Sequence, residues 1–159
     1  CYYQKRGLQI GVIRTSNIYG PFDRFDDEKS HVIPALIKRA MAKEDPFVVW
    51  GNGNTIRDFV YVDDLVDGVL RVLNGYCIAE PINISYGTPV SVNELVKVIL
   101  GICDHHVPPQ YDQTKPTAVP YRVLDNTKAE NLFGKIEKTP LQEGIQKTVD
   151  WYTSDLSRD

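Results

Sequence analysis

Three side chains that could bind an anionic ligand each follow a short apolar or flexible segment of the 159-residue chain. Asn17 comes after the apolar run 8–14, and its amide offers hydrogen-bond donors as well as acceptors. Arg57 follows the glycine-containing turn 51–54, and Arg122 follows a proline-rich stretch. A guanidinium group can bind phosphate oxygens through two parallel hydrogen bonds. These residue types are therefore suited to a ligand that carries a diphosphate.

Each of these residues also has a purely structural explanation. Asn17 lies in the segment 14–21, whose Asn, Gly and Pro are typical of a turn. Arg57 precedes Asp58, and the two could form a structural ion pair. Arg122 could be a solvated side chain beside an irregular connector. Residue type leaves both explanations open, so the decision depends on the elements that position these segments.

Short apolar runs alternate with amphipathic segments, and this pattern predicts an α/β fold. The segment 2–7 has the basic residues and the glycine of a helix end, and 8–14 has the pattern of a buried parallel strand. A polar loop at 15–24 then leaves the carboxyl end of this strand, where α/β proteins bind ligands. The pattern also predicts helices at 32–41, 91–103, 126–133 and 139–154, and a further helix that begins after an N-cap at Asp63 or Asp64. Strands are predicted at 47–50, 56–62, 81–85 and 121–124, and an irregular stretch at 105–120.

Composition and charge argue against several other classes of protein. The net charge of −3 disfavours general binding to nucleic acid or to an anionic membrane. No apolar run approaches the roughly 20 residues of a membrane span, and the polar start of the chain does not resemble an export signal. Three widely separated cysteines indicate free thiols in a reducing compartment. Cys103, His105 and His106 lack the spaced partners of a metal site, so no metal is expected.

The order of the ligand-binding segments resembles the extended short-chain dehydrogenase/reductase family, whose members are nucleotide-sugar epimerases, dehydratases and reductases. The segment 14–21 is similar to the family pattern R-x-x-N-x-Y-G-P, although Thr15 stands where proline is common. The segment 50–64 matches G-x-G-x-x-x-R-D-F-x-Y-V-x-D, the most specific of the motifs. The segment 115–125 matches K-P-x-x-x-P-x-R-x-x-D, and 141–152 looks like the closing L-x-E-G-I…W-Y helix. The resemblance therefore covers nearly the whole chain.

The resemblance implies a role for six residues in binding a nucleotide-diphosphate sugar. Within the family, the segments 30–37 and 48–51 are most similar to the GDP-L-fucose synthase branch, which uses NADPH. Asn17 would contact the substrate near its sugar-phosphate end. Arg57 and Arg122 would hold the diphosphate, with Arg122 in place of a lysine. The residues that would wall the nucleotide base are Val32, Leu36 and Trp50.

Two motifs of the family are absent from the places in the sequence where the family would have them. It contains no glycine-rich NAD(P) loop, and the segment before Arg14 contains no Tyr-x-x-x-Lys pair, since neither Tyr2 nor Tyr3 is followed by lysine at that spacing. In the family this pair lies in the helix before Arg14. The resemblance therefore implies the C-terminal, substrate-binding part of such an enzyme, as a single region that lacks most of the Rossmann domain. In this division, 1–20 would be a remnant of the Rossmann sheet and 21–159 the nucleotide-sugar-binding part.

These considerations predict the nucleotide-sugar-binding half of an NAD(P)-dependent epimerase or reductase similar to GDP-L-fucose synthases. NAD or NADP would act in the complete enzyme, and this chain alone is expected to bind no cofactor, to hold no catalytic residue and to be inactive. Its expected partners are a nucleotide-diphosphate sugar, a missing N-terminal half and a second copy joined through the apolar strand, in the cytoplasm. Two alternatives stay open: a non-catalytic binding or interaction module, and a fragment of a UDP- or dTDP-sugar 4-epimerase or 4,6-dehydratase.

Overall fold

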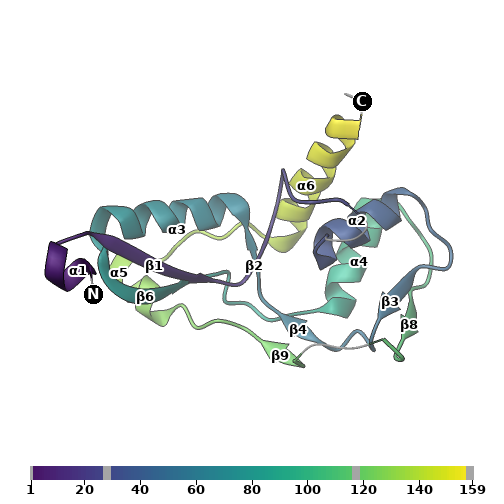
Figure 1. Ribbon diagram of the computed structural model, residues 1–159. Helices are drawn as coiled ribbons and strands as arrows, with labels where there is room; N and C mark the ends of the chain where they lie inside the picture. The colour runs from purple at the N-terminus through teal and green to yellow at the C-terminus, as the bar shows by residue number, and fades with distance from the viewer. Residues whose placement is uncertain (1, 27–29, 116–118, 157–159) are drawn as a thin grey trace.

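The computed structural model describes residues 2–26, 30–115 and 119–156, with side chains described as far as residue 154. In Figure 1 the strands 10–15 and 78–84 run side by side at one end of the molecule, and the helices 32–41, 92–102 and 141–156 lie towards the other end. The strands are β1 (Ile10–Thr15), β2 (Asn17–Tyr19), β3 (Val48–Trp50), β4 (Ile56–Arg57), β5 (Phe59–Tyr61), β6 (Ile78–Ile84), β7 (Val90–Ser91), β8 (Gln110–Asp112) and β9 (Tyr121–Arg122). The helices are α1 (Tyr2–Arg6), α2 (Val32–Met41), α3 (Val62–Gly75), α4 (Val92–Ile102), α5 (Thr127–Phe133) and α6 (Leu141–Leu156).

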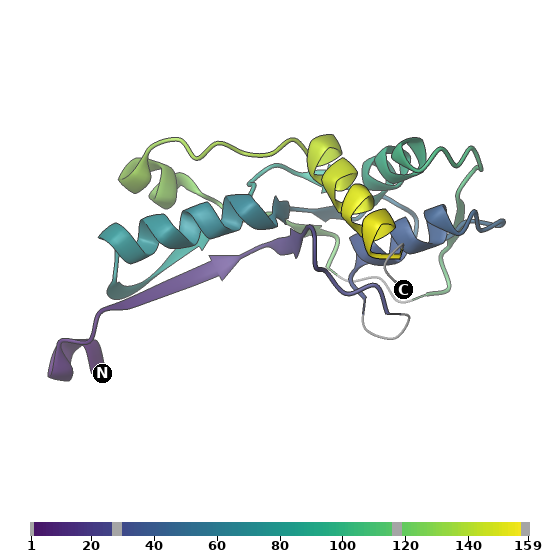
Figure 2. The same cartoon turned by 90° about the horizontal axis from the view of Figure 1, so that it is seen from above.

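The strands β1 and β6 form a parallel pair, and α3 lies against them (Figure 2). The register runs from Ile10 opposite Ile78 to Thr15 opposite Ile84. Gly68 allows α3 to approach β6 closely, because a Cβ at this position would lie 2.4 Å from a methyl carbon of Ile84. The α/β alternation predicted from the sequence is therefore confirmed. A small core forms here from Val72, Tyr76, Ile82, Ile84, Ala129 and Ile136.

A second and larger core lies under α2, α4 and α6. It is bordered by three small sheets: the parallel pairs β2–β5 and β3–β8, and the three-stranded sheet β7–β4–β9. In that last sheet β4 pairs antiparallel with β7 and parallel with β9. The fully buried side chains of this core include Phe47, Ile37, Leu95, Ile99 and Ile145. This half of the fold positions the segments to which the sequence assigned ligand binding.

A buried polar link joins the two cores. Asp58, between β4 and β5, is 1% exposed, and its carboxylate accepts hydrogen bonds from the backbone N–H groups of Gly87 (3.0 Å) and Leu124 (3.3 Å). Ser85 and Asn126 lie at the same junction and bond to each other through side chain and backbone. These bonds fix the segments that follow β6 and precede α5 against β5.

Several predicted elements need correction. The expected loop 15–24 contains the strand β2, because its backbone pairs with β5. The expected strand 56–62 is interrupted at the buried Asp58 and becomes β4 and β5. Neither Asp63 nor Asp64 caps α3, whose N-cap is Tyr61 without a side-chain bond. The helix at 32–41 is confirmed at both ends, as is the capping box that opens α4.

Apolar side chains remain exposed on β1 and α3. Val12 on β1 is 36% exposed and Leu70 on α3 is 51% exposed, and Leu8, just before β1, is 54% exposed. The strand at 8–14 was predicted to be buried on both faces, and in this chain it is not, because no described element covers its outer edge or its second face. Among the described residues, no helix is long and apolar enough to cross a membrane.

Candidate functional site

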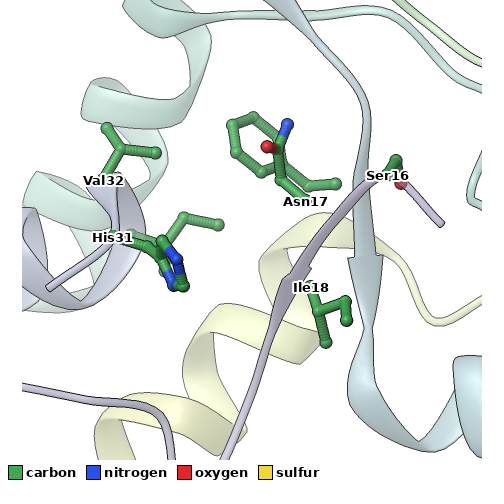
Figure 3. A pocket seen from close by; sticks show the side chains of 7 residues that line it. Ser16, Asn17, Ile18, His31 and Val32 are labelled. Carbon is green, nitrogen blue, oxygen red and sulfur yellow. The ribbon is translucent and has the colours of Figure 1, made fainter.

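A cavity of about 270 Å³ lies between β2 and the start of α2. It is lined by Ser16, Asn17, Ile18, His31, Val32, Ile33 and Phe59. Figure 3 shows His31 and Val32 extending from the start of α2 towards Asn17 and Ile18 on β2. Two of the predicted site residues, Asn17 and Val32, are therefore brought to one cavity.

Asn17 is held in the cavity wall by the backbone of Asp58. Its side-chain amide donates to the Asp58 carbonyl at 3.0 Å, and its backbone N–H donates to the same carbonyl at 3.2 Å. Asn17 and Phe59 are register partners in the β2–β5 pair. The turn-like sequence around Asn17 therefore forms a strand end that is bonded to one carbonyl through both its backbone and its side chain, and this fixes the amide in the cavity wall.

Arg57 and Arg122 are register partners in the parallel strands β4 and β9. Side chains of register partners project to the same face of a sheet, so the two guanidinium groups share one face. Arg57 is half-buried, and its Nη1 donates to the carbonyl of Ile56 at 2.6 Å. Arg122 is exposed. An ion pair between Arg57 and Asp58 was one alternative, but both carboxylate oxygens of Asp58 bond to backbone N–H groups.

The three residues expected to wall a base lie in different surroundings. Val32 is 42% exposed at the mouth of the cavity. Trp50 is 64% exposed at the end of β3, where the Lys115 ammonium lies 5.7 Å from the ring centroid. Leu36 is 5% exposed and belongs to the larger core, so it does not line the cavity. The structure therefore leaves Val32 and Trp50 accessible to a ligand and buries Leu36 in the core.

His31 is a site residue that the sequence patterns did not single out. It is the N-cap of α2, but its side chain makes no capping hydrogen bond. Ser, Thr, Asp and Asn are the residues that cap helices well, so histidine at this position is a local signal for another use. The ring lines the cavity, and its Nδ1 lies 3.6 Å from Oδ1 of Asp23. An imidazole can both donate and accept a proton, which gives the cavity a group for proton transfer.

The other histidines have structural partners. His105 is buried and its Nε2 lies 2.8 Å from the carbonyl of Glu44, while His106 pairs with Asp104 at 2.7 Å. Across residues 2–26, 30–115 and 119–156, no three His, Cys, Asp or Glu side chains are grouped as metal ligands. Burial raises the pKa of Tyr19, and it does so for the pKa of Tyr61 as well. Neither phenol is therefore prepared to exchange a proton near neutral pH.

Comparison with protein families matches residues 2–85 to the NAD dependent epimerase/dehydratase family, and the chain belongs to this family. Among similar proteins, "Probable GDP-L-fucose synthase 1" of Oryza sativa subsp. japonica is 34% identical over 98% of this chain and 48% of its own length. "GDP-L-fucose synthase 1" of Arabidopsis thaliana is 35% identical over 89% of this chain and 45% of its own length. The chain thus spans about half the length of these relatives.

Solved structures show the same fold. A UDP-glucose 4-epimerase of Thermotoga maritima with UDP-glucose has a TM-score of 0.88 and 30% identity, over 98% of this chain and 49% of that protein. A GDP-L-fucose synthetase of Naegleria fowleri has a TM-score of 0.86 and 24% identity, over 92% of this chain and 47% of that protein. The predicted family and the partial extended short-chain dehydrogenase/reductase fold are therefore confirmed.

The family implies an NAD(P) cofactor, and the residues of this chain provide only part of the groups that would hold it. A dinucleotide binds at the carboxyl ends of parallel strands, on a glycine-rich loop that opens a helix. The sequence contains no such loop. At the end of β1 and directly after it, the hydroxyls of Thr15 and Ser16 are buried and have no hydrogen-bond partner among the described residues. These hydroxyls could meet a polar group of the cofactor, but the sequence supplies no element that would hold its pyrophosphate.

Proposed function

We propose that this chain is the nucleotide-sugar-binding half of an NAD(P)-dependent epimerase or reductase that acts as GDP-L-fucose synthases do. The observation that carries the proposal is the pairing of Arg57 with Arg122 on one face of adjacent strands. Two guanidinium groups side by side match the two phosphates of a nucleoside diphosphate in charge and hydrogen bonding. The structural alternative for Arg57, an ion pair with Asp58, has lost its support because the Asp58 carboxylate is used elsewhere.

The remaining site residues divide between the two ends of such a ligand. The exposed ring of Trp50 and the side chain of Val32 offer apolar faces for a flat base, and Leu36 supports the wall from the core. Asn17 and His31 line the cavity, which has room for a sugar. We assign the cavity to the glycosyl group because its polar residues can hydrogen-bond hydroxyl or carbonyl oxygens.

In this proposal His31 moves a proton at the sugar. Epimerisation next to a carbonyl requires removal of a proton from carbon and its return to the other face, and a positioned acid or base speeds both steps. The His31 ring is placed in the cavity wall to take part in such a transfer. In the complete enzyme the nicotinamide would supply hydride transfer, and this chain's residues would bind and orient the sugar.

We further propose that the chain is inactive alone and that its exposed strand recruits another chain. The unpaired edge of β1, with Val12, and the outer face of α3, with Leu70, present apolar surface at one end of the molecule. The N-terminal half of a family member, or a second copy of this chain, would cover it. The free thiols of Cys77 and Cys103 support a reducing, cytoplasmic location.

Two other functions retain specific support. The likeness to the Thermotoga epimerase solved with UDP-glucose favours a uridine nucleotide over a guanine nucleotide. The absence of a glycine-rich loop from the sequence fits a binding module without catalysis. An intact mass of the native protein separates the last possibility from the half-enzyme: a chain about twice as long supports the enzyme.

The fluorescence of Trp50 provides the test of nucleotide binding. The chain has two tryptophans, so Trp151→Phe leaves Trp50 as the single indole. Stacking of a base on Trp50 should quench its emission saturably on titration with GDP, and UDP and dTDP should bind more weakly. A matched variant, Trp50→Phe with Trp151 kept, should give no saturable change. The proposal fails if none of the three nucleotides changes Trp50 emission and calorimetry also detects no binding.

A further inference from the structure

Asp23 places a mostly buried carboxylate beside the ring of His31. It lies in the loop between β2 and α2, and its side chain is only 14% exposed, whereas that of His31 is 77% exposed. Oδ1 of Asp23 is 3.6 Å from Nδ1 of His31. This separation is slightly longer than a hydrogen bond. Catalytic hydrogen bonds are often this long before a ligand binds.

The local structure does not account for the burial of this carboxylate. Oδ1 accepts the backbone N–H of Arg24 at 2.7 Å. Oδ2 is buried and has no hydrogen-bond partner among the described residues. A buried carboxylate oxygen without a partner destabilises a fold, so its presence needs an explanation, and a catalytic role is one of the known explanations. The Arg24 guanidinium lies 3.9 Å from Asp26, and among the residues that the structure describes the His31 ring is the side chain that faces Asp23.

The loop that carries Asp23 is fixed on both sides. Phe25 stacks on Tyr152 of α6 with 4.1 Å between ring centroids and 10° between ring planes. Phe22 contacts Trp151 at 5.1 Å and takes a positive φ of 67°. A positive φ is unfavourable for an aromatic residue, so the contacts around the loop must hold it there. The carboxylate is therefore held in place before any ligand arrives.

A second cavity of about 220 Å³ lies on the other side of His31. His31 and Ile18 line both cavities, and Asp23 lines only the second. Asp23 therefore approaches the ring from the side away from the proposed sugar. This arrangement gives the two ring nitrogens different environments.

We propose that Asp23 is a positioning residue that sets the tautomer and the orientation of His31. The Nδ1–H of the neutral ring donates towards the carboxylate, and Nε2 keeps its lone pair for a ligand in the cavity between β2 and α2. A base with a fixed lone pair transfers protons better than a ring that samples both tautomers. The inference rests on the proposed function for what Nε2 does to a sugar, while the pairing with Asp23 stands on the distances alone.

The tautomer of His31 can be measured on this chain by ¹⁵N and ¹³C NMR of the imidazole rings. The neutral His31 ring should be mainly the Nδ1–H form in the wild type. In Asp23→Leu the ratio of Nδ1–H to Nε2–H should fall severalfold. The control Asp26→Leu removes a carboxylate from the same loop and should leave the ratio unchanged, as should the rings of His105 and His106 in all variants.

Two results would overturn the pairing: a wild-type His31 that is mainly Nε2–H, or a folded Asp23→Leu with the wild-type ratio. If Asp23→Leu does not fold, Asp23→Asn, with a weaker acceptor, should lower the ratio to a smaller extent. Titration with GDP and with a GDP-hexose on the same samples separates the two proposals. A paired His31 whose resonances respond to neither ligand would refute the proposed function and leave the pairing intact.

Discussion

Replacing Arg57 by alanine should weaken binding of a nucleoside diphosphate about tenfold to a hundredfold. The guanidinium has five N–H donors, and one nitrogen is used by the Ile56 carbonyl, so donors remain for a phosphate. A hydrogen bond to a charged group contributes about 1.5–3 kcal/mol, and each 1.4 kcal/mol is about a factor of ten in Kd. Arg57 is half-buried and Arg122 is exposed, so Arg122→Ala should cost less, about 1 kcal/mol or fivefold.

Isothermal calorimetry with GDP on the two single variants and the double variant measures these effects. If both side chains contact one diphosphate, the losses will not add, because neighbouring groups that share a ligand are coupled. Arg71→Ala is the matched control: it removes the same charge, but Arg71 pairs with Asp67 at 2.7 Å on α3. Equal affinity of wild type and Arg57→Ala would refute the assignment, and so would an equal loss in Arg71→Ala, which would show general electrostatic attraction.

Three further outcomes follow from other parts of the structure. Asp58→Asn should lower the free energy of unfolding by about 1–3 kcal/mol in urea titrations, because one of two buried backbone donors loses its acceptor. The hydrogen bonds from Ser91 lower the pKa of the Glu94 carboxyl group. The ionised Glu94 carboxylate therefore stabilises the folded state fully above the unfolded pKa near 4.5, and this stabilisation is lost as pH falls. Glu94→Gln should therefore flatten the acid limb of stability, measured by urea unfolding between about pH 3 and pH 6. The chain should self-associate at tens of micromolar in light scattering, and Val12→Lys should shift it towards monomer, whereas a monodisperse wild-type monomer would contradict this.

The sequence was most informative where local chemistry decides the structure. The helix 32–41 was predicted at both ends, because apolar residues at helical spacing and Pro34 in the first turn agree with the tertiary packing. The capping box at Ser91 was predicted for the same reason. The division of 56–62 into two strands could not be predicted, since it depends on Asp58 bonding to residues far along the chain.

The candidate site shows the same limit. Asn17 and Val32 line one cavity, although the family resemblance assigned Asn17 to the sugar-phosphate end of the substrate and Val32 to its base. Leu36 is buried in the larger core, and helical spacing does not tell which of two apolar faces meets a ligand. His31 was missed as a ligand-facing residue. The signal in the sequence was its poor match to an N-cap, and the carboxylate of Asp23 that gives the ring a partner becomes visible only in three dimensions.

The buried polar link at Asp58 has a consequence for how the molecule opens. Each of the two cores is stabilised by its own apolar contacts. The junction between the cores depends on a few hydrogen bonds around Asp58, Ser85 and Asn126. Structures of this kind come apart as separate cooperative units whose amide protons exchange with solvent at different free energies. The unit that contains β1 and α3 has the smaller core and the exposed apolar side chains. Its amides should be the first to exchange, and covering β1 with another chain would slow that exchange while the cavity between β2 and α2 kept its shape.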